Sequence, residues 1–305
     1  MIAFIFSFTA CRDYAIPYTE DTSSSSSTSS SGGSSGGSSG GSSGGGGSSV
    51  PTGNMVTLSS LTGTSYTAQS DDVLTGQLPS GISITIASGA TVTLYNATIT
   101  GNSSAGITCA GNATITLAGT NSVTGKPGIC VPSGSTLTIN GNGSVNATGT
   151  GQAAGIGSSG NYPENGGNII ISGGNITAQG GSHGAGIGGG EYTSIGTITI
   201  NGGTIHATGG SSAPGIGSGG SNYSQCGNIS ITGGTITATG GWYAAGIGGG
   251  SQGACGTITI TAGVTSVTAT KGQSGGNPPS ASIGAAYNGT CGTVTIASGA
   301  NVTQN

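Results

Sequence analysis

A short glycine-rich block recurs along the chain and limits the folds that the sequence can adopt. The block reads "AGIG", as in "AGIGGG" at 185–190, or a close variant of it. Its isoleucine returns at intervals of 22 to 36 residues, at Ile107, Ile129, Ile156, Ile187, Ile216, Ile247 and Ile283. Self-similarity at such a period is typical of stacked repeats, in which each unit buries its apolar face against the next unit.

Each block is followed by two segments with strand-like alternation. After Ile187 these are "GTITI" at 196–200 and "GGTIHATGG" at 202–210. An alternation of period two sends neighbouring side chains to opposite faces of a strand. We therefore expect an inward set of Ala185, Ile187, Ile198, Ile200, Ile205 and Ala207. The outward set is Thr197, Thr199, Thr204, His206 and Thr208.

Three short strands per repeat, joined by Gly-Gly corners, form a coil that closes only by stacking on the next coil. The sequence thus predicts an all-β, single-stranded parallel β-helix (a β-solenoid) over residues 51–305. The 68 glycines and the 3% of charged residues suit such a stack better than a globule. Eight "xTITI"-type segments, counted from "ISITI" at 82–86, predict about eight coils and a body ~40 Å long.

The repeat resembles that of a family of bacterial cell-surface proteins. The segment "AGIGGGEYTSIGTITINGGTIHATGG" at 185–210 is similar to the repeats of right-handed parallel β-helix proteins from gut and rumen bacteria, described as carbohydrate-binding or adhesin-like lipoproteins. The resemblance covers about residues 52–305. It implies a right-handed coil and, as an expectation, a binding function.

The glycines also match the dinucleotide fingerprint GxGxxG, at 155–160, 184–189 and 215–220. A nucleotide-binding glycine loop follows a strand and opens a helix. Here each copy leads into a polar loop and another strand. We therefore assign these glycines to corners and close coil contacts, and expect no nucleotide.

The N-terminal part of the chain looks like an export signal and a tether. Residues 1–11 form a short apolar run that ends in Thr9-Ala10-Cys11, which resembles a bacterial lipobox with Cys11 as the lipidation site; the alternative is an ordinary or truncated signal peptide. Residues 12–50, rich in serine and glycine, are expected to be a disordered tether. The expected location is the cell surface or outer membrane, or secretion, with membrane contact only through the lipid anchor.

Three cysteines occupy one repeat position. Cys226, Cys255 and Cys291 each precede Gly-[Asn/Thr]-[Ile/Val], and Ile195 holds the same place one coil earlier. Adjacent coils bring Cα atoms within the range that a disulfide accepts. One adjacent pair can therefore bridge and leave the third thiol free; buried small side chains without a bridge are the alternative. Cys109 and Cys130 are offset by one position, which disfavours their pairing.

Ionisable residues are too few for a convincing catalytic centre. Between 51 and 305 the acids are Asp71, Asp72, Glu164 and Glu191. We place Asp71 and Asp72 in a capping turn before the first coil, and Glu164 and Glu191 in loops of adjacent coils. The segment has two lysines and no arginine, whereas polysaccharide-cleaving β-helices need paired carboxylates, or carboxylates with Ca²⁺ and a strong base. We expect no enzyme, cofactor or metal site, and three basic residues against seven acids in the chain argue against nucleic acid.

Aromatic residues recur in the loops that follow the "AGI" blocks. Four tyrosines lie four to seven residues after the isoleucine of their coil, and Trp242-Tyr243 precedes such a block. A row of aromatic faces beside carboxylates suits sugar rings. The predicted glycan site is Tyr162, Glu164, Glu191, Tyr192, Tyr223, Trp242, Tyr243 and Tyr287. Alternatively, the tyrosines clamp the loops onto the body.

The prediction from sequence is therefore a non-catalytic surface β-helix that binds polysaccharide or glycan through its loop aromatics. The main alternative is a structural surface spacer or coat protein without a specific ligand. Outward threonine ladders such as Thr235/Thr237/Thr239 also allow ice binding, although His206 interrupts them. β-propensity alone explains those threonines.

Overall fold

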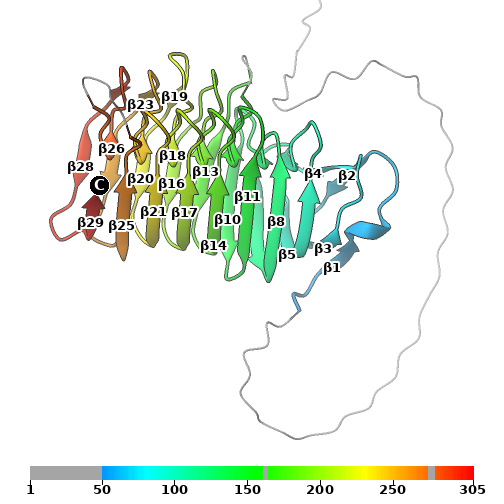
Figure 1. Cartoon of the computed structure of the whole chain (residues 1–305). Coiled ribbons are helices and arrows are strands. Elements are labelled where there is room, and N and C mark those ends of the chain that lie inside the picture. Colours follow the sequence, from blue (N-terminus) through cyan, green and yellow to red (C-terminus); the bar gives the residue numbers. More distant parts are fainter. Residues whose placement is uncertain (1–49, 161–163, 274–278) are drawn as a thin grey trace, which may run out of the picture.

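The computed structural model describes residues 50–160, 164–273 and 279–305. Within them the chain winds as a right-handed parallel β-helix, with β1 near one end of the solenoid and β29 at the other (Figure 1). The predicted signal segment, Cys11 and the tether up to residue 49 lie outside the described residues.

Each coil contributes strands to three faces. The first face contains β1 (Asn54–Thr57), the first parts of β3 (Asp72–Gln77) and β5 (Thr91–Thr100), β7 (Ala113–Ala118), β10 (Thr136–Gly141), β13 (Asn168–Ile171), β16 (Ile198–Ile200), β20 (Ile229–Ile231), β24 (Ile258–Ile260) and β28 (Val294–Ile296). The second face contains the ends of β3 and β5, then β8 (Thr120–Gly125), β11 (Ser144–Gly149), β14 (Asn175–Gln179), β17 (Thr204–Thr208), β21 (Thr235–Thr239), β25 (Ser266–Thr270) and β29 (Val302–Gln304).

The third face is built mainly from the "AGIG" blocks and their variants. It contains β2 (Ser65–Ala68), β4 (Ser83–Ile86), β6 (Ile107–Cys109), β9 (Ile129–Cys130), β12 (Ile156–Gly157), β15 (Ile187–Gly188), β18 (Ile216–Gly217), β22 (Ile247–Gly248) and β26 (Ile283–Gly284). A short ladder between the third face and the first face of the next coil contains β19 (Gln225–Cys226), β23 (Ala254–Cys255) and β27 (Thr290–Cys291). The third face has nine strands, which is close to the predicted number of coils.

The coils stack with identical residues in register. On the third face Ile156 pairs with Ile187, which pairs with Ile216, and the series continues through the later coils. Every inward residue that the alternation predicted is buried, and the outward set of threonines with His206 is partly or fully exposed. The interior is one continuous cluster of isoleucine, valine, leucine and alanine along the solenoid.

Two assignments from the sequence were wrong. The segment "ISITI" at 82–86 contains β4, which pairs with β6 of the third face and not with the "GTITI" strands of the first. Both faces have the same period-two alternation, so the pattern alone cannot tell them apart. Asp71 and Asp72 do not precede the first coil, because β1 and β2 come before them and Asp72 begins β3.

Glycine is required where the third face turns outward. Gly157, Gly188, Gly217, Gly248 and Gly284 follow the stacked isoleucines and have φ between 128° and 144°. A Cβ atom added to Gly188 would collide with the carbonyl oxygen of Gly217 in the next coil. The glycines of the GxGxxG-like pattern thus allow close coil stacking.

The coil-closing ladder outside the three faces carries the cysteines. Cys226 is the register partner of Cys255, and Cys255 is the partner of Cys291. A disulfide joins Cys255 to Cys291, whose Cα atoms lie 4.5 Å apart, and Cys226 is a buried free thiol. Cys109 is also a buried free thiol, so it does not bridge to Cys130.

A buried carboxylate organises the N-terminal coil. Asp72 accepts hydrogen bonds from Asn54 Nδ2 (2.7 Å), the Tyr66 hydroxyl (2.7 Å) and the Gln69 N–H (2.9 Å). Burial opposes the charge, but these hydrogen bonds outweigh it and hold the pKa of Asp72 below its usual range. The ionised carboxylate therefore ties β1, β2 and β3 together.

We expect Gly188→Ala to lower the free energy of unfolding by at least ~3 kcal/mol, because it adds a steric overlap to an unfavourable φ. Gly134 is the matched control, since its φ is 79° and a Cβ atom there meets nothing within 4 Å. Gly134→Ala should cost only ~1–2 kcal/mol. Urea unfolding measures both values, and equal costs would contradict the stacking argument.

Acid should loosen the N-terminal coil first. Because the folded-state pKa of Asp72 is depressed, its contribution is complete above the unfolded-state pKa of about 3.9 and disappears as the pH falls through the lower folded-state value. Hydrogen exchange of residues 54–77 as a function of pH measures this effect. Asp72→Asn should remove the pH dependence of that region, and an unchanged profile in this variant would refute the assignment.

Candidate functional site

The candidate site lies on the loops that follow the third face. A backbone hydrogen bond repeated from coil to coil holds each loop against the corner of the preceding coil. In it Glu191 N–H donates to Gln152 O (2.9 Å), and Gly220 N–H donates to His183 O (3.0 Å). The same bond joins Ser251 to Ser212 (2.8 Å) and Tyr287 to Tyr243 (3.2 Å). We call this line of contacts the loop–corner seam.

Two tyrosines from adjacent loops form an exposed pair. Tyr192 is 41% exposed and Tyr223 is 66% exposed. Their ring centroids lie 6.4 Å apart with the planes tilted by 46°. The Tyr192 N–H donates to Ser221 Oγ (3.1 Å), so a backbone-to-side-chain hydrogen bond also joins the two loops. The pair offers an apolar surface along the direction of coil stacking.

The remaining described aromatics of the predicted site differ in exposure. Tyr243 and Tyr287 are half-buried and contact each other, with ring centroids 5.1 Å apart. They join a loop to its corner, as the clamp alternative supposes. Trp242 is 60% exposed at the same corner. Tyr162 lies outside the described residues.

The two glutamates of the predicted site have different environments. Glu164 is partly buried, and its Oε2 accepts a hydrogen bond from Ser159 Oγ (2.7 Å). Glu191 is only 7% exposed, and its Oε2 has no hydrogen-bond partner among the described residues. The charge of Glu191 raises the pKa of the neighbouring Tyr192. The field of this carboxylate therefore reaches the exposed ring.

Hydroxyl groups that the sequence analysis overlooked hold the Glu191 loop. Ser158 Oγ accepts from the Gly190 N–H (3.0 Å) and contacts Thr193 Oγ1 (2.8 Å). Thr193 Oγ1 also lies within hydrogen-bond distance of the carbonyl oxygens of Ser159 and Gly190. Both side chains are fully buried. Threonine is common in this sequence, so its presence alone does not single out Thr193. The one signal in the sequence is that Thr193 lies outside the strands in which threonines alternate outward.

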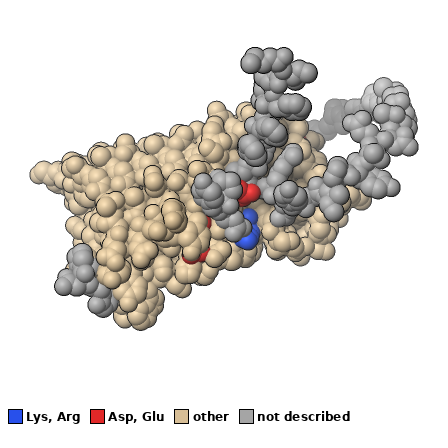
Figure 2. Space-filling model, turned by 90° about the horizontal axis from the view of Figure 1, so that it is seen from above, with Lys and Arg blue, Asp and Glu red and all other residues tan. Residues whose placement is uncertain are grey.

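Charged side chains are sparse around the site. Figure 2 shows that the visible Lys/Arg and Asp/Glu side chains gather in one small area of the face seen from above, while the other described residues visible on this face are uncharged. Among the described residues, no group of three or more His, Cys, Asp or Glu is placed to hold a metal ion. The site can therefore offer stacking, hydrogen bonding and a local negative charge.

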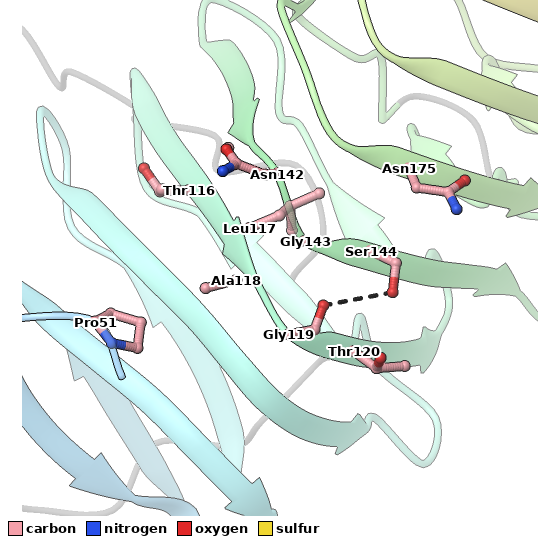
Figure 3. Close-up of a pocket in the computed structure, with 11 residues that line it drawn as sticks. Pro51, Thr116, Leu117, Ala118, Gly119, Thr120, Asn142, Gly143, Ser144 and Asn175 are labelled. Atoms are coloured by element: carbon pink, nitrogen blue, oxygen red, sulfur yellow. Dashed lines mark hydrogen bonds between the residues drawn. The ribbon is translucent and has the colours of Figure 1, made fainter. Parts of the chain in front are cut away.

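A pocket of about 660 Å³ lies elsewhere, at the corner between the first and second faces (Figure 3). It is lined by uncharged residues, among them Pro51, Thr116, Asn142, Ser144 and Asn175. Ser144 Oγ donates to Gly119 O across it (3.4 Å). No aromatic ring lines this pocket, so it does not coincide with the tyrosine loops.

The outward threonines form ordered columns on the second face. Thr237 and Thr268 are register partners, but His206 occupies the same column one coil earlier and is exposed. The interruption that the sequence indicated is therefore present in the array. No helix in the described part of the chain is long and apolar enough to cross a membrane.

Comparison with known families agrees with the coil architecture. The family described as "Beta helix repeat" matches residues 137–160, 169–191, 198–220 and 229–251. Each matched segment runs from a first-face strand through the second and third faces into a site-bearing loop. No curated protein and no solved structure gives a match. The fold and the repeat match together identify the chain as a right-handed parallel β-helix repeat protein.

Proposed function

We propose that this protein is an exported, surface-displayed and non-catalytic β-helix that binds polysaccharide or glycan through its loop aromatics. In this proposal Cys11 carries a lipid anchor, residues 12–50 form the tether, and neither nucleotide nor nucleic acid is a partner. β-Helix repeats occur in both enzymes and non-enzymes, so the non-catalytic role does not follow from the fold. The support comes from the loops.

The observation that carries the proposal is the exposed Tyr192–Tyr223 pair. These rings lie on loops outside the hydrophobic core, so the stacked coils do not need them for stability. Exposed aromatic faces lose apolar hydration when a sugar ring stacks on them, and neighbouring polar groups can bind its hydroxyls. Trp242 adds a third exposed aromatic surface near the clamp formed by Tyr243 and Tyr287.

The arrangement also suits a polymer. Tyr192 and Tyr223 come from consecutive coils, and coils repeat every ~4.8 Å along the solenoid. That spacing is similar to the length of one sugar unit in an extended chain. A polysaccharide lying along the axis can therefore contact equivalent loops in succession.

Replacing both exposed rings should weaken binding without unfolding the protein. We expect the Tyr192→Ala/Tyr223→Ala double variant of the full chain to lose about tenfold or more in affinity for its glycan. Trp242→Ala should lose affinity separately if the ligand extends to that corner. Pull-down on insoluble polysaccharides and a glycan array measure these effects.

Tyr95, on β5 of the first face and partly buried, provides the control, since Tyr95→Ala should bind like the wild type. If the wild type binds no glycan, the proposal fails and the structural spacer is favoured. Shortening of the polymer would instead indicate an enzyme. Thermal hysteresis without glycan binding would indicate that the threonine columns bind ice.

A further inference from the structure

Two buried side-chain atoms have no hydrogen-bond partner among the described residues, and both lie on the loop–corner seam. They are Glu191 Oε2 and His183 Nδ1. Buried polar groups in native proteins are almost always satisfied, because an unsatisfied group costs free energy. The exceptions therefore call for an explanation, especially where they adjoin an exposed aromatic pair.

The topology places these residues close together. His183 and Gln152 occupy equivalent positions, each four residues before a stacked isoleucine of adjacent coils. The Glu191 N–H donates to the carbonyl oxygen of Gln152. One coil further on, the Gly220 N–H donates to the carbonyl oxygen of His183. Glu191 and His183 thus lie in one stretch of the seam. Glu191 Oε2 and His183 Nδ1 take no part in the hydrogen bonds that secure the loop, whereas the Glu191 carboxylate as a whole also interacts with the Tyr192 side chain.

We propose that Glu191, with His183, determines which class of glycan the site accepts: neutral, hydroxyl-rich chains, to the exclusion of uronate-containing or sulfated ones. This inference rests on the proposed function. A carboxylate only accepts hydrogen bonds, so it favours ligand hydroxyls and repels ligand anions. Stacking on Tyr192 and Tyr223 is indifferent to charge, and Glu191 therefore supplies the discrimination.

The experiment compares the full-length wild type with Glu191→Gln on one neutral polysaccharide, cellulose, and one anionic polysaccharide, polygalacturonate. We expect Glu191→Gln to lower the ratio of the affinity for cellulose to the affinity for polygalacturonate by about tenfold or more. Spectrophotometric titration should also show a lower pKa for Tyr192 in this variant, because the Glu191 charge no longer raises it. Hydrogen exchange of the Tyr192 N–H, which donates to Ser221 Oγ, verifies that the loop is still folded. Asp71→Asn is the matched control, because it removes one negative charge at an exposed position of the N-terminal coil, outside the predicted site.

An unchanged ratio of neutral to anionic binding in Glu191→Gln would overturn this inference while leaving the proposed function intact. A wild type that prefers the anionic chain would also overturn it. If the wild type binds no glycan on the array either, both proposals fail together.

The cysteine ladder carries a second, independent inference. Cys226, Cys255 and Cys291 stand one above another on successive coils, and only the last two are bonded. The Cys226 thiol therefore lies on the side of Cys255 opposite to Cys291. Thiol–disulfide exchange requires this order, since the attacking and leaving sulfurs flank the central one. Cys226 Sγ lies 3.9 Å from Gly196 O of the preceding coil, so its side chain has to turn toward Cys255 before the exchange.

We infer that the disulfide moves along this ladder. The Cys226 thiol loses its proton and its Sγ bonds to Cys255 Sγ; the Cys255–Cys291 bond breaks, and Cys291 leaves as a thiolate that takes up a proton. One disulfide and one thiol are present before and after, so no oxidant or reductant is needed. In the exchanged form the Cys226–Cys255 disulfide tethers the end of the loop that carries Tyr223. The loop that carries Tyr287 is no longer tethered, because Cys291 is then a free thiol.

Differential alkylation with peptide mass spectrometry tests the exchange on the full chain. Burial raises the pKa of Cys226 to about 12, so exchange should be slow at neutral pH and faster in alkaline buffer. We expect the label to appear on Cys291 as well as Cys226 after alkaline incubation. In Cys226→Ser, Cys291 should stay unlabelled, which separates exchange from hydrolysis or unfolding. If Cys291 of the wild type stays unlabelled at all times, the inference is overturned.

Discussion

The close vertical stacking of coils is the constraint on which the rest of the structure depends. Parallel ladders join each coil to the next, and the backbones approach so closely at the third-face turn that a Cβ atom at Gly188 would overlap the next coil. Glycine at this position is therefore a condition for the ladder. The stack in turn buries one isoleucine on another and makes a core from side chains that could not fill a globule.

The stacked core also explains why the candidate site lies on loops. Residues on the three faces either point into the apolar interior or form outward columns made mostly of small polar side chains. The loops after the third face project the large aromatic rings of Tyr192 and Tyr223, and a corner before that face projects Trp242. The loop–corner seam fixes them through backbone hydrogen bonds, which leaves their side chains available for a ligand.

The repeat made the fold predictable from the sequence, whereas the site was predictable only in outline. Stacked residues such as Ile187 and Cys255 could be aligned because each coil repeats the same register. The face to which β4 belongs could not be predicted, because the first and third faces have the same period-two alternation. Nor could the division between exposed Tyr223 and half-buried Tyr287, since it depends on how each loop folds back onto its corner. Whether these rings bind a glycan stays a prediction.

The loop–corner seam makes the surface modular in a way that a globular binding cleft is not. Each coil interacts chiefly with its two neighbours, so the chain can gain or lose a whole coil without redesigning the others. Such a change lengthens or shortens the row of loops by one step and leaves every remaining loop in its local setting. A longer row of individually weak contacts increases avidity for a repetitive polymer steeply, because successive contacts are no longer independent encounters. Coil number would then set the strength of attachment, and loop sequence would set its selectivity.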